Sequence, residues 1–199
     1  AMKNNKFFGV LYREIISFIE LIIITLFLMT MIFTYVLRIA TVNGDSMKNT
    51  LISGDRLITT AFCNSPEQGD IVIIYAGDAV TLDENRNLEI NRGLHKTLVK
   101  RVIAVEGQTV DIDFERGSVY VDSVMLDESY ITGLTHMDEG AFTGQYPVTV
   151  PKGYVFVLGD NRQVSKDSRS SELGFVAVKN ITGKVLMRIS PLETFGFVK

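Results

Sequence analysis

A continuous apolar run near the N-terminus dominates the pattern of hydrophobic and polar positions. From Leu21 to Leu37 the chain reads LIIITLFLMTMIFTYVL, which is 17 residues without a charge, and residues 15–19 extend the run backwards. A helix of this length reaches across the hydrocarbon core of a bilayer, because each residue adds about 1.5 Å. Helices of soluble proteins seldom stay apolar on every face for so long. The pattern predicts one membrane helix over residues 15–39.

After residue 40 the apolar positions gather instead in short β-rich runs separated by turn signals such as Gly-Asp, Pro-Glu and Arg-Gly. This pattern predicts a mainly β, antiparallel and barrel-like domain over residues 40–199. Residues 78–94 are polar and predict a hairpin tip or a mobile loop, and residues 122–150 predict a small excursion from the core. The predicted strands are Arg56–Phe62, Asp70–Tyr75, Thr97–Val105, Thr109–Phe114, Ser118–Val121, Tyr154–Leu158 and Gly183–Ile189.

The charges around the apolar run predict its orientation. Lys3, Lys6 and Arg13 precede the run, so the positive-inside rule places residues 1–14 as a cytoplasmic tip. A cleaved signal peptide would need a small residue near the end of the run, where Arg38 stands. We therefore expect an uncleaved, single-pass anchor in the cell membrane, with the β domain on the extracytoplasmic face.

Composition excludes several classes of function. The chain has 20 Lys and Arg against 23 Asp and Glu, so it lacks the basic face that a nucleic-acid partner requires. One cysteine, Cys63, closes no intrachain disulfide and builds no cysteine-based zinc site, and the two histidines match no HExxH spacing. No phosphate-binding glycine loop is present. We expect no metal and no cofactor, so any catalysis must use a different nucleophile.

Ser46 is the first candidate for that nucleophile. It lies in Asn43-Gly44-Asp45-Ser46-Met47, directly after the apolar run. A serine in such a turn presents its hydroxyl beside free backbone N–H groups, which is what an oxyanion hole uses. Gly-Asp-Ser is also an ordinary turn sequence, so the motif alone does not decide.

Lys100 and Arg101 stand side by side in the predicted strand Thr97–Val105. Their side chains point to opposite faces, so we expect one of the two cations to lie among apolar groups. Burial lowers the pKa of a lysine, and a neutral amine is able to act as general base toward a serine, whereas arginine stays protonated. The alternative is a lysine at a strand edge that reaches water.

A third stretch is dense in hydrogen-bonding side chains and follows the predicted strand Tyr154–Leu158. It reads Gly159-Asp160-Asn161-Arg162 and continues with Ser165, Asp167, Ser168 and Arg169. Asp167 and Arg169 are able to pair, and Ser165 is able to orient a neutral lysine amine. The alternative is a polar turn that satisfies its own backbone.

Taken in order, these stretches resemble the type I signal peptidases, and among them the single-anchor, Gram-positive-like members. This family consists of membrane-anchored Ser/Lys endopeptidases that remove signal peptides from exported preproteins. The resemblance extends from the anchor to Pro191. The motifs that carry it are Gly44-Asp45-Ser46-Met47-x-x-Thr50-Leu51, Lys100-Arg101-Val102 and Leu158-Gly159-Asp160-Asn161-Arg162-x-x-Ser165-x-Asp167-Ser168-Arg169.

The resemblance implies a catalytic role for each matching residue. Ser46 would be the nucleophile, and Lys100 the general base. The Ser46 N–H would be one oxyanion donor; Gly44 stands where some members carry a serine hydroxyl, so the second donor stays open. Supporting roles fall to Ser165, which would hydrogen-bond the lysine amine, to the pair Asp167 and Arg169, and to Gly159.

The resemblance also implies how substrate would bind. A secretory preprotein would lie as an added strand beside residues 41–45 and 97–100, in contact with Asp45, Met47 and Val99. Shallow pockets would accept small residues at positions −1 and −3, so cleavage would follow Ala-x-Ala-like sites.

Two departures from the family pattern keep a second hypothesis open. Asn49 stands where the family usually has proline, and residues 104–108 read AVEGQ in place of the usual GLPGD. Such divergence resembles specialised or non-cleaving members that serve surface-pilus assembly, with pilin precursors as partners. Because Ser46 and Lys100 are both present, we favour the active peptidase.

Overall fold

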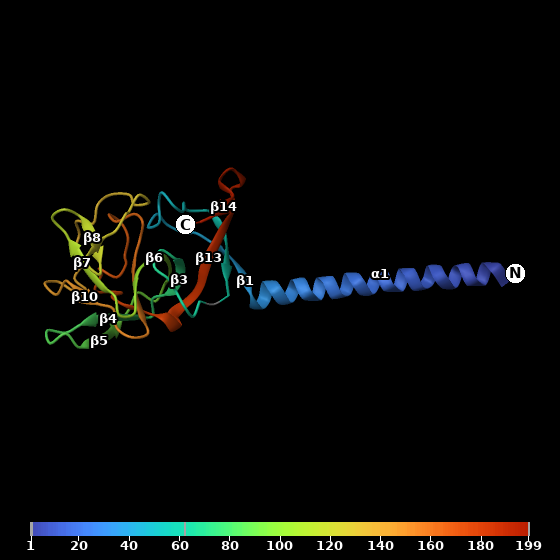
Figure 1. The fold of residues 1–199 in the computed structure, drawn as a ribbon, viewed down its shortest axis with the longest axis horizontal. Coiled ribbons are helices and arrows are strands. Elements are labelled where there is room, and N and C mark those ends of the chain that lie inside the picture. The colour runs from blue at the N-terminus through green and yellow to red at the C-terminus, as the bar shows by residue number, and fades with distance from the viewer. Residues whose placement is uncertain (1, 62, 199) are drawn as a thin grey trace. The chain divides into compact units, whose positions relative to one another are not determined.

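The computed structural model describes residues 2–61 and 63–198, which separate into a helical unit up to Arg38 and a β domain from Ile39 onward. Helix α1 (Met2–Tyr35) makes up the first unit (Figure 1). Its stretch Tyr12–Tyr35 is 24 residues long and apolar enough to cross a membrane. The apolar run of the sequence is therefore one uninterrupted helix.

The ends of this helix differ from the prediction. It ends at Tyr35, four residues before the predicted boundary at residue 39, and β1 (Leu37–Thr41) follows almost at once. Apart from Arg38, residues 36–39 are as apolar as the helix, so hydropathy does not place the boundary at Tyr35, and the pairing of β1 with β2 sets it instead. At the other end, α1 continues through most of the predicted cytoplasmic tip.

The β domain consists of short strands, and each of the predicted runs overlaps one of them. Two single 3₁₀ turns, η1 (Val178–Asn180) and η2 (Leu192–Thr194), flank the longest strand. The strands after β1 are β2 (Arg56–Thr60), β3 (Ile71–Tyr75), β4 (Asp78–Leu82), β5 (Leu88–Arg92), β6 (Thr97–Val105), β7 (Thr109–Asp113), β8 (Ser118–Val121), β9 (Val124–Met125), β10 (Val148–Thr149), β11 (Tyr154–Leu158), β12 (Val176–Ala177), β13 (Ile181–Ser190) and β14 (Gly196–Phe197).

In the described part of the chain these strands form three sheets. The largest has the order β1-β2-β13-β3-β6-β11-β12, with β14 beside β13; a second has the order β10-β7-β8-β9, and β4 pairs with β5. Strand β13 pairs with β3 through its first half and with β2 through its second half, so it joins the two sides of the large sheet. Strand β6 lies in the interior of that sheet, antiparallel to both β3 and β11.

Apolar side chains cover both faces of β6. On one face Ile103 packs with Phe142 and Phe156, and on the other Val102 packs with Val155. A half-exposed antiparallel strand would bury only alternate side chains, but a strand covered on both faces buries all of them. This placement decides the environment of the two cations in the strand.

The two weakly patterned stretches both have defined structure. Residues 78–94 contain the β4–β5 hairpin, in which Asp78 pairs with Arg92 and Leu82 with Leu88. Residues 122–150 return to the core, because Phe142 is fully buried there and β10 pairs with β7.

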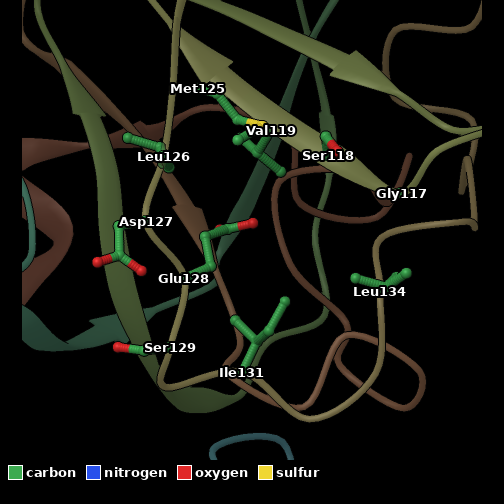
Figure 2. Close-up of a pocket in the computed structure, with 10 residues that line it drawn as sticks. All are labelled: Gly117, Ser118, Val119, Met125, Leu126, Asp127, Glu128, Ser129, Ile131 and Leu134. Atoms are coloured by element: carbon green, nitrogen blue, oxygen red, sulfur yellow. The ribbon is translucent and has the colours of Figure 1, made fainter.

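A cavity of about 480 Å³ lies between the β8–β9 hairpin and residues 126–134. Figure 2 shows Glu128, Ile131 and Leu134 around this cavity. Neither Ser46 nor Lys100 lines it, so it is separate from the predicted site.

Candidate active site

The serine turn, residues 44–50, follows β1 and holds Ser46 half-buried. Leu51 and Met47 are completely buried beneath it, and the Leu51 N–H donates to the Met47 carbonyl at 2.8 Å. Gly44 opens the turn with φ +98°, a conformation that side chains rarely adopt. Two buried apolar anchors and a glycine thus present the hydroxyl at a fixed place.

Lys100 lies directly beside this hydroxyl. Its Nζ is 2.8 Å from the Ser46 Oγ, although 54 residues separate the two in the chain. The Lys100 side chain is only 1% exposed in the interior of the sheet. Burial lowers the pKa of Lys100 from 10.5 to about 8, and the carboxylates of Asp167 and Asp160 offset part of that effect. A substantial fraction of this amine is therefore neutral at mildly alkaline pH, where an ordinary lysine stays protonated.

Arg101 corrects the expectation that only one of the two cations is buried. It is 3% exposed on the opposite face of β6 from Lys100. Its guanidinium binds Asp160 through Nε at 2.8 Å and Nη2 at 2.6 Å, and it stacks 4.0 Å from the ring centroid of Tyr130. A bidentate carboxylate compensates the buried charge of Arg101, whereas the Lys100 amine has no such carboxylate partner among the described residues and contacts the Ser46 hydroxyl instead.

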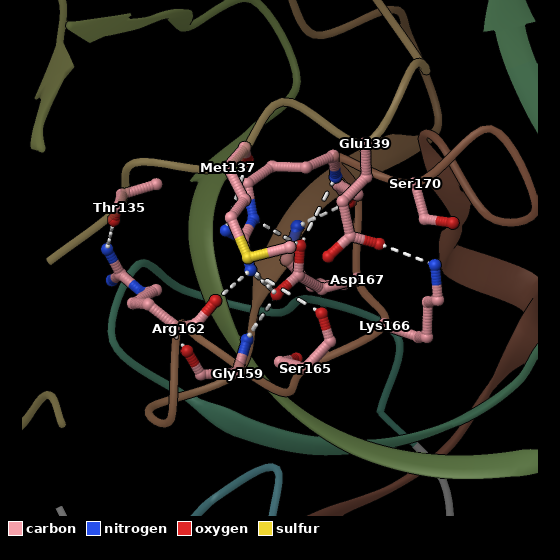
Figure 3. A network of polar contacts seen from close by, with 12 residues as sticks. Thr135, Met137, Glu139, Gly159, Arg162, Ser165, Lys166, Asp167 and Ser170 are labelled. Atoms are coloured by element: carbon pink, nitrogen blue, oxygen red, sulfur yellow. Dashed lines mark hydrogen bonds and ion pairs between the residues drawn. The ribbon is translucent and has the colours of Figure 1, made fainter. Parts of the chain in front are cut away.

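The polar loop, residues 159–169, contributes a second buried ion pair, which interacts electrostatically with the Lys100 amine. The Arg169 Nε binds Asp167 Oδ1 at 2.9 Å, and both side chains are completely buried. The Gly159 N–H donates to Asp167 Oδ2 at 3.0 Å. Figure 3 shows Asp167 in the middle of this network, beside Gly159 and Ser165.

The charge state of Asp167 follows from these contacts. Burial by itself would raise the pKa of this carboxyl, but the Arg169 guanidinium and the donated hydrogen bonds lower it below its ordinary value. The Asp167 carboxylate in turn interacts electrostatically with Lys100, and it limits how far burial lowers the pKa of the amine.

Ser165 is placed in the site without its predicted partner. Its hydroxyl is buried and has no hydrogen-bond partner within the described residues, Lys100 included. An unpaired buried hydroxyl is uncommon and costs free energy. It lies against Gly159, whose other neighbour is the Ser46 carbonyl oxygen.

Gly159 leaves no room for a side chain, and this makes a direct test of the packing. A Cβ at this position would meet Ser165 and would lie 2.5 Å from the Ser46 carbonyl oxygen. We expect Gly159→Ala to displace the serine turn and to lower kcat for peptide cleavage by about 100-fold, with a loss in unfolding free energy of about 1–3 kcal/mol.

Gly144→Ala is the matched control for that measurement. Gly144 has a positive φ of 70°, which Gly159 does not have, and no atom lies within 4 Å of its would-be Cβ. The control should lose some stability through backbone strain and keep its kcat. Equal kcat values for both variants would show that the contact at Gly159 has no part in positioning Ser46.

A second cavity adjoins the Ser46 hydroxyl. It measures about 290 Å³ and lies between the segment after β1 and the start of β6. Of the three predicted substrate contacts, Met47 and Val99 line this cavity, whereas Asp45 is exposed and does not. Most of the lining is apolar and comes from Ala40, Val42, Met47, Ile73, Leu98 and Val99.

The two candidate oxyanion donors differ in availability. In the described part of the chain the Ser46 N–H has no acceptor, so it is free to bind an incoming oxygen. The Gly44 N–H instead donates to the Ser53 Oγ, at a long 3.4 Å. Both residues border the 290 Å³ cavity.

Sequence reasoning assigned no role to Asp160 and Asn161, which the structure places against the site. The Asn161 N–H donates to the Ser46 carbonyl at 3.0 Å, and its side-chain amide donates to the Asp45 carbonyl at 3.1 Å. Asp160 binds Arg101 on one side and the Thr50 hydroxyl on the other. The position of Asp160 and Asn161 in the dense polar stretch was the one signal that could have indicated a role for them. The local sequence does not indicate their partners, which lie more than 50 residues away.

Known proteins are similar in sequence to most of this chain. The family model described as signal peptidase, peptidase S26, matches residues 15–190. The probable signal peptidase I-1 of Synechocystis sp. is 33% identical over 181 residues, which is 89% of this chain and 84% of that protein. Signal peptidase IB of Staphylococcus aureus is 29% identical over 200 residues, which is 93% of this chain and 94% of that protein.

A solved structure also matches. The crystal structure of a signal peptidase I from Enterococcus faecalis has 27% sequence identity and a TM-score of 0.43, covering 60% of this chain and 96% of that one. The family match spans both Ser46 and Lys100 as well as the polar loop. The chain therefore belongs to the signal peptidase family, peptidase S26, as a type I signal peptidase.

Proposed function

We propose that this chain cleaves signal peptides from exported preproteins with a Ser46–Lys100 dyad. The observation that carries the proposal is the 2.8 Å contact between the Ser46 Oγ and a buried amine whose pKa is lowered to about 8. A serine hydroxyl is a weak nucleophile until a neighbouring base takes its proton. A lysine whose pKa is lowered toward neutrality supplies that base without histidine or metal.

Each step of the proposed reaction can be assigned to a named group. Neutral Lys100 accepts the Ser46 proton as the Oγ attacks the scissile carbonyl carbon. The new oxyanion then accepts a hydrogen bond from the Ser46 N–H. The Lys100 ammonium then protonates the departing amine, which leaves an acyl ester on Ser46. Water attacks this ester with Lys100 again as base, and the signal peptide is released with a free carboxylate while Ser46 regains its proton.

The polar loop supports this cycle. Charged Asp167, fixed by Arg169, stabilises the Lys100 ammonium that forms during each acylation. The unpaired Ser165 hydroxyl is available to hydrogen-bond the amine when Ser46 has turned to the substrate. Gly44 remains the candidate position for a second oxyanion contact.

The 290 Å³ cavity suits the end of a signal peptide. An extended substrate strand beside residues 41–45 and 97–100 would place its −1 and −3 side chains toward Val99, Met47 and their neighbours. The mostly apolar lining of the cavity is compatible with the Ala-x-Ala-like sites that the family resemblance implies. Asp45, exposed outside this cavity, stays a candidate contact for substrate backbone only.

The membrane anchor would bring the enzyme to its substrates. Helix α1 is apolar over Tyr12–Tyr35, and Lys3, Lys6 and Arg13 precede or begin that stretch. The positive-inside rule then puts the N-terminus in the cytoplasm and the β domain on the extracytoplasmic face of the cell membrane. Preproteins emerging through the membrane, pilin precursors among them, would meet the site there.

The pH dependence of cleavage tests this proposal. We expect the rate to rise about tenfold per pH unit below pH 8 and to level off above it, because only neutral Lys100 accepts a proton and its neutral fraction grows with pH. The measurement is cleavage of a preprotein with alanine at −1 and −3 by the full chain in detergent micelles, between pH 6 and 10.

The same preprotein with phenylalanine at −1 is the control, and it should stay uncut because the family resemblance implies small residues at −1 and −3. A rate that is flat from pH 6 to 9 would contradict Lys100 as the base. Failure to cut either preprotein at any pH would favour the non-cleaving accessory of pilus assembly.

A further inference from the structure

Residues 131–132 lie between the serine turn and the polar loop and contact both of them. On the side of the polar loop, the Thr132 N–H donates to the Asp160 carbonyl at 2.7 Å, and the Arg162 N–H donates to the Thr132 carbonyl at 3.1 Å. Thr132 and Asn161 form a parallel β-bridge, so the segment is fixed to this loop as a short added strand.

On the side of the serine turn, the same two residues make side-chain contacts. The Thr132 hydroxyl donates to the Lys48 carbonyl at 3.2 Å. The Asn49 side-chain amide donates to the Ile131 carbonyl, also at 3.2 Å, across 82 residues of sequence. Asn161 already holds the beginning of the turn through the Asp45 and Ser46 carbonyls. Residues 131–132 therefore hold the end of the serine turn.

The segment itself is anchored in the interior. Arg162 is buried, and its guanidinium binds Glu128 and Thr135 on either side of residues 131–132 and also donates to the Gly159 carbonyl at 3.0 Å. Glu128 and Ile131 appear together beside the larger cavity in Figure 2, while Arg162 meets Thr135 at the edge of the network in Figure 3. A buried ion pair thus fixes what Asn49 binds.

Asn49 is suited to this contact by its backbone. Its φ is +88°, in the left-handed region that asparagine tolerates better than most residues. Proline, which the family usually carries here, is locked near −65° and cannot adopt this conformation. The departure from the family pattern therefore coincides with a different turn shape. It also coincides with a side-chain hydrogen bond to Ile131 that proline cannot make, because proline has no side-chain donor.

We propose that Asn49 is a positioning residue that latches the serine turn to the polar loop through the Ile131 carbonyl. The inference rests on the proposed Ser46–Lys100 reaction and adds a contact outside the dyad. The latch holds the Ser46 Oγ in line with Lys100 and the substrate, and displacement of a reacting atom by an ångström costs up to about 100-fold in rate. Loss of the latch should leave Lys100 buried, and burial is the main cause of the lowered pKa of its amine.

Two substitutions separate the hydrogen bond from the backbone conformation. Asn49→Asp keeps the size and the tolerance for positive φ but places an acceptor against the Ile131 carbonyl. Asn49→Gly keeps the φ and removes the side chain. We expect both to lower kcat by about tenfold, with KM unchanged and with the rise of the rate below pH 8 unchanged. Asn91→Asp, on the exposed strand β5, is the matched control and should behave as the parent chain.

The readout is kcat, KM and the pH profile of preprotein cleavage by the full chain in detergent micelles. Parental kcat in either Asn49 variant would overturn the latch, and so would a fall in kcat accompanied by a shifted pH profile. Thr132→Val, which removes the Lys48 contact from the other partner, should give the same kinetic signature and carries the test if an Asn49 variant fails to fold. Cleavage by Ser46→Ala would instead refute the dyad, whatever the Asn49 variants do.

Discussion

Replacing Ser46 by alanine is expected to abolish preprotein cleavage, with a fall in kcat/KM on the order of 1,000-fold or more. Alanine lacks the Oγ, which is the atom that lies 2.8 Å from the Lys100 amine and is the proposed nucleophile. Ser46 is half-buried at the edge of a cavity and its neighbours Met47 and Leu51 anchor the turn, so the fold should be retained. The measurement is cleavage of the Ala-x-Ala preprotein, with thermal unfolding as a check on the fold.

Ser129→Ala provides the matched control for this experiment. Ser129 is exposed and lines the larger cavity away from Ser46 and Lys100, so its removal should leave cleavage unchanged. Undiminished cleavage by Ser46→Ala would rule out the dyad. Full support of pilus assembly by Ser46→Ala in a cell would point to the accessory function.

Replacing Lys100 is expected to have an effect of similar size, and the choice of substituent shows why. Lys100→Arg keeps a cation in the site, but a guanidinium does not give up its proton, so it cannot serve as base. Lys100→Met keeps the length of the side chain without any basic group. Both should lower kcat/KM on the order of 1,000-fold, and the double variant Ser46→Ala/Lys100→Met should be no less active than either single one, because the two residues act as a unit.

The Lys100→Met variant should also be more stable than the parent. The folded-state pKa of about 8 lies below the ordinary 10.5, so between these values the unfolded chain binds more protons and stability rises with pH. Below pH 8 the buried amine costs the full difference, about 3 kcal/mol, and above 10.5 it costs nothing. A denaturant titration at pH 7 should show the gain for Lys100→Met, whereas Lys96→Met, at an exposed site, should show none. A Lys100→Met chain that keeps cleaving would exclude Lys100 as the base.

The sequence predicts strands such as Thr97–Val105 well because local composition alone sets them. Their β-branched residues and the turn signals at their ends are read without knowledge of any partner. The end of α1 is different. Apart from Arg38, residues 36–39 are apolar, and the pairing of β1 with β2 decides between helix and strand.

The site shows the same division between local and distant information. Ser46 and Lys100 stand out through their motifs, whereas the burial of Arg101 depends on Asp160, 59 residues away. The contact between Asn49 and Ile131 depends on a loop whose polar sequence predicts only an excursion. Local pattern thus identifies the candidate reacting groups, and distant pairing determines which residues hold them in place.

The location of Lys100 in a strand covered on both faces has a consequence for the nascent protein. In an unfolded chain this lysine is hydrated and protonated at neutral pH, and Ser46 is then an ordinary alcohol. The covering elements include β11 and the polar loop, which come more than 50 residues later in the chain. In the proposed mechanism, activation of the serine is therefore a late event of folding, and a half-made domain would have no proteolytic activity.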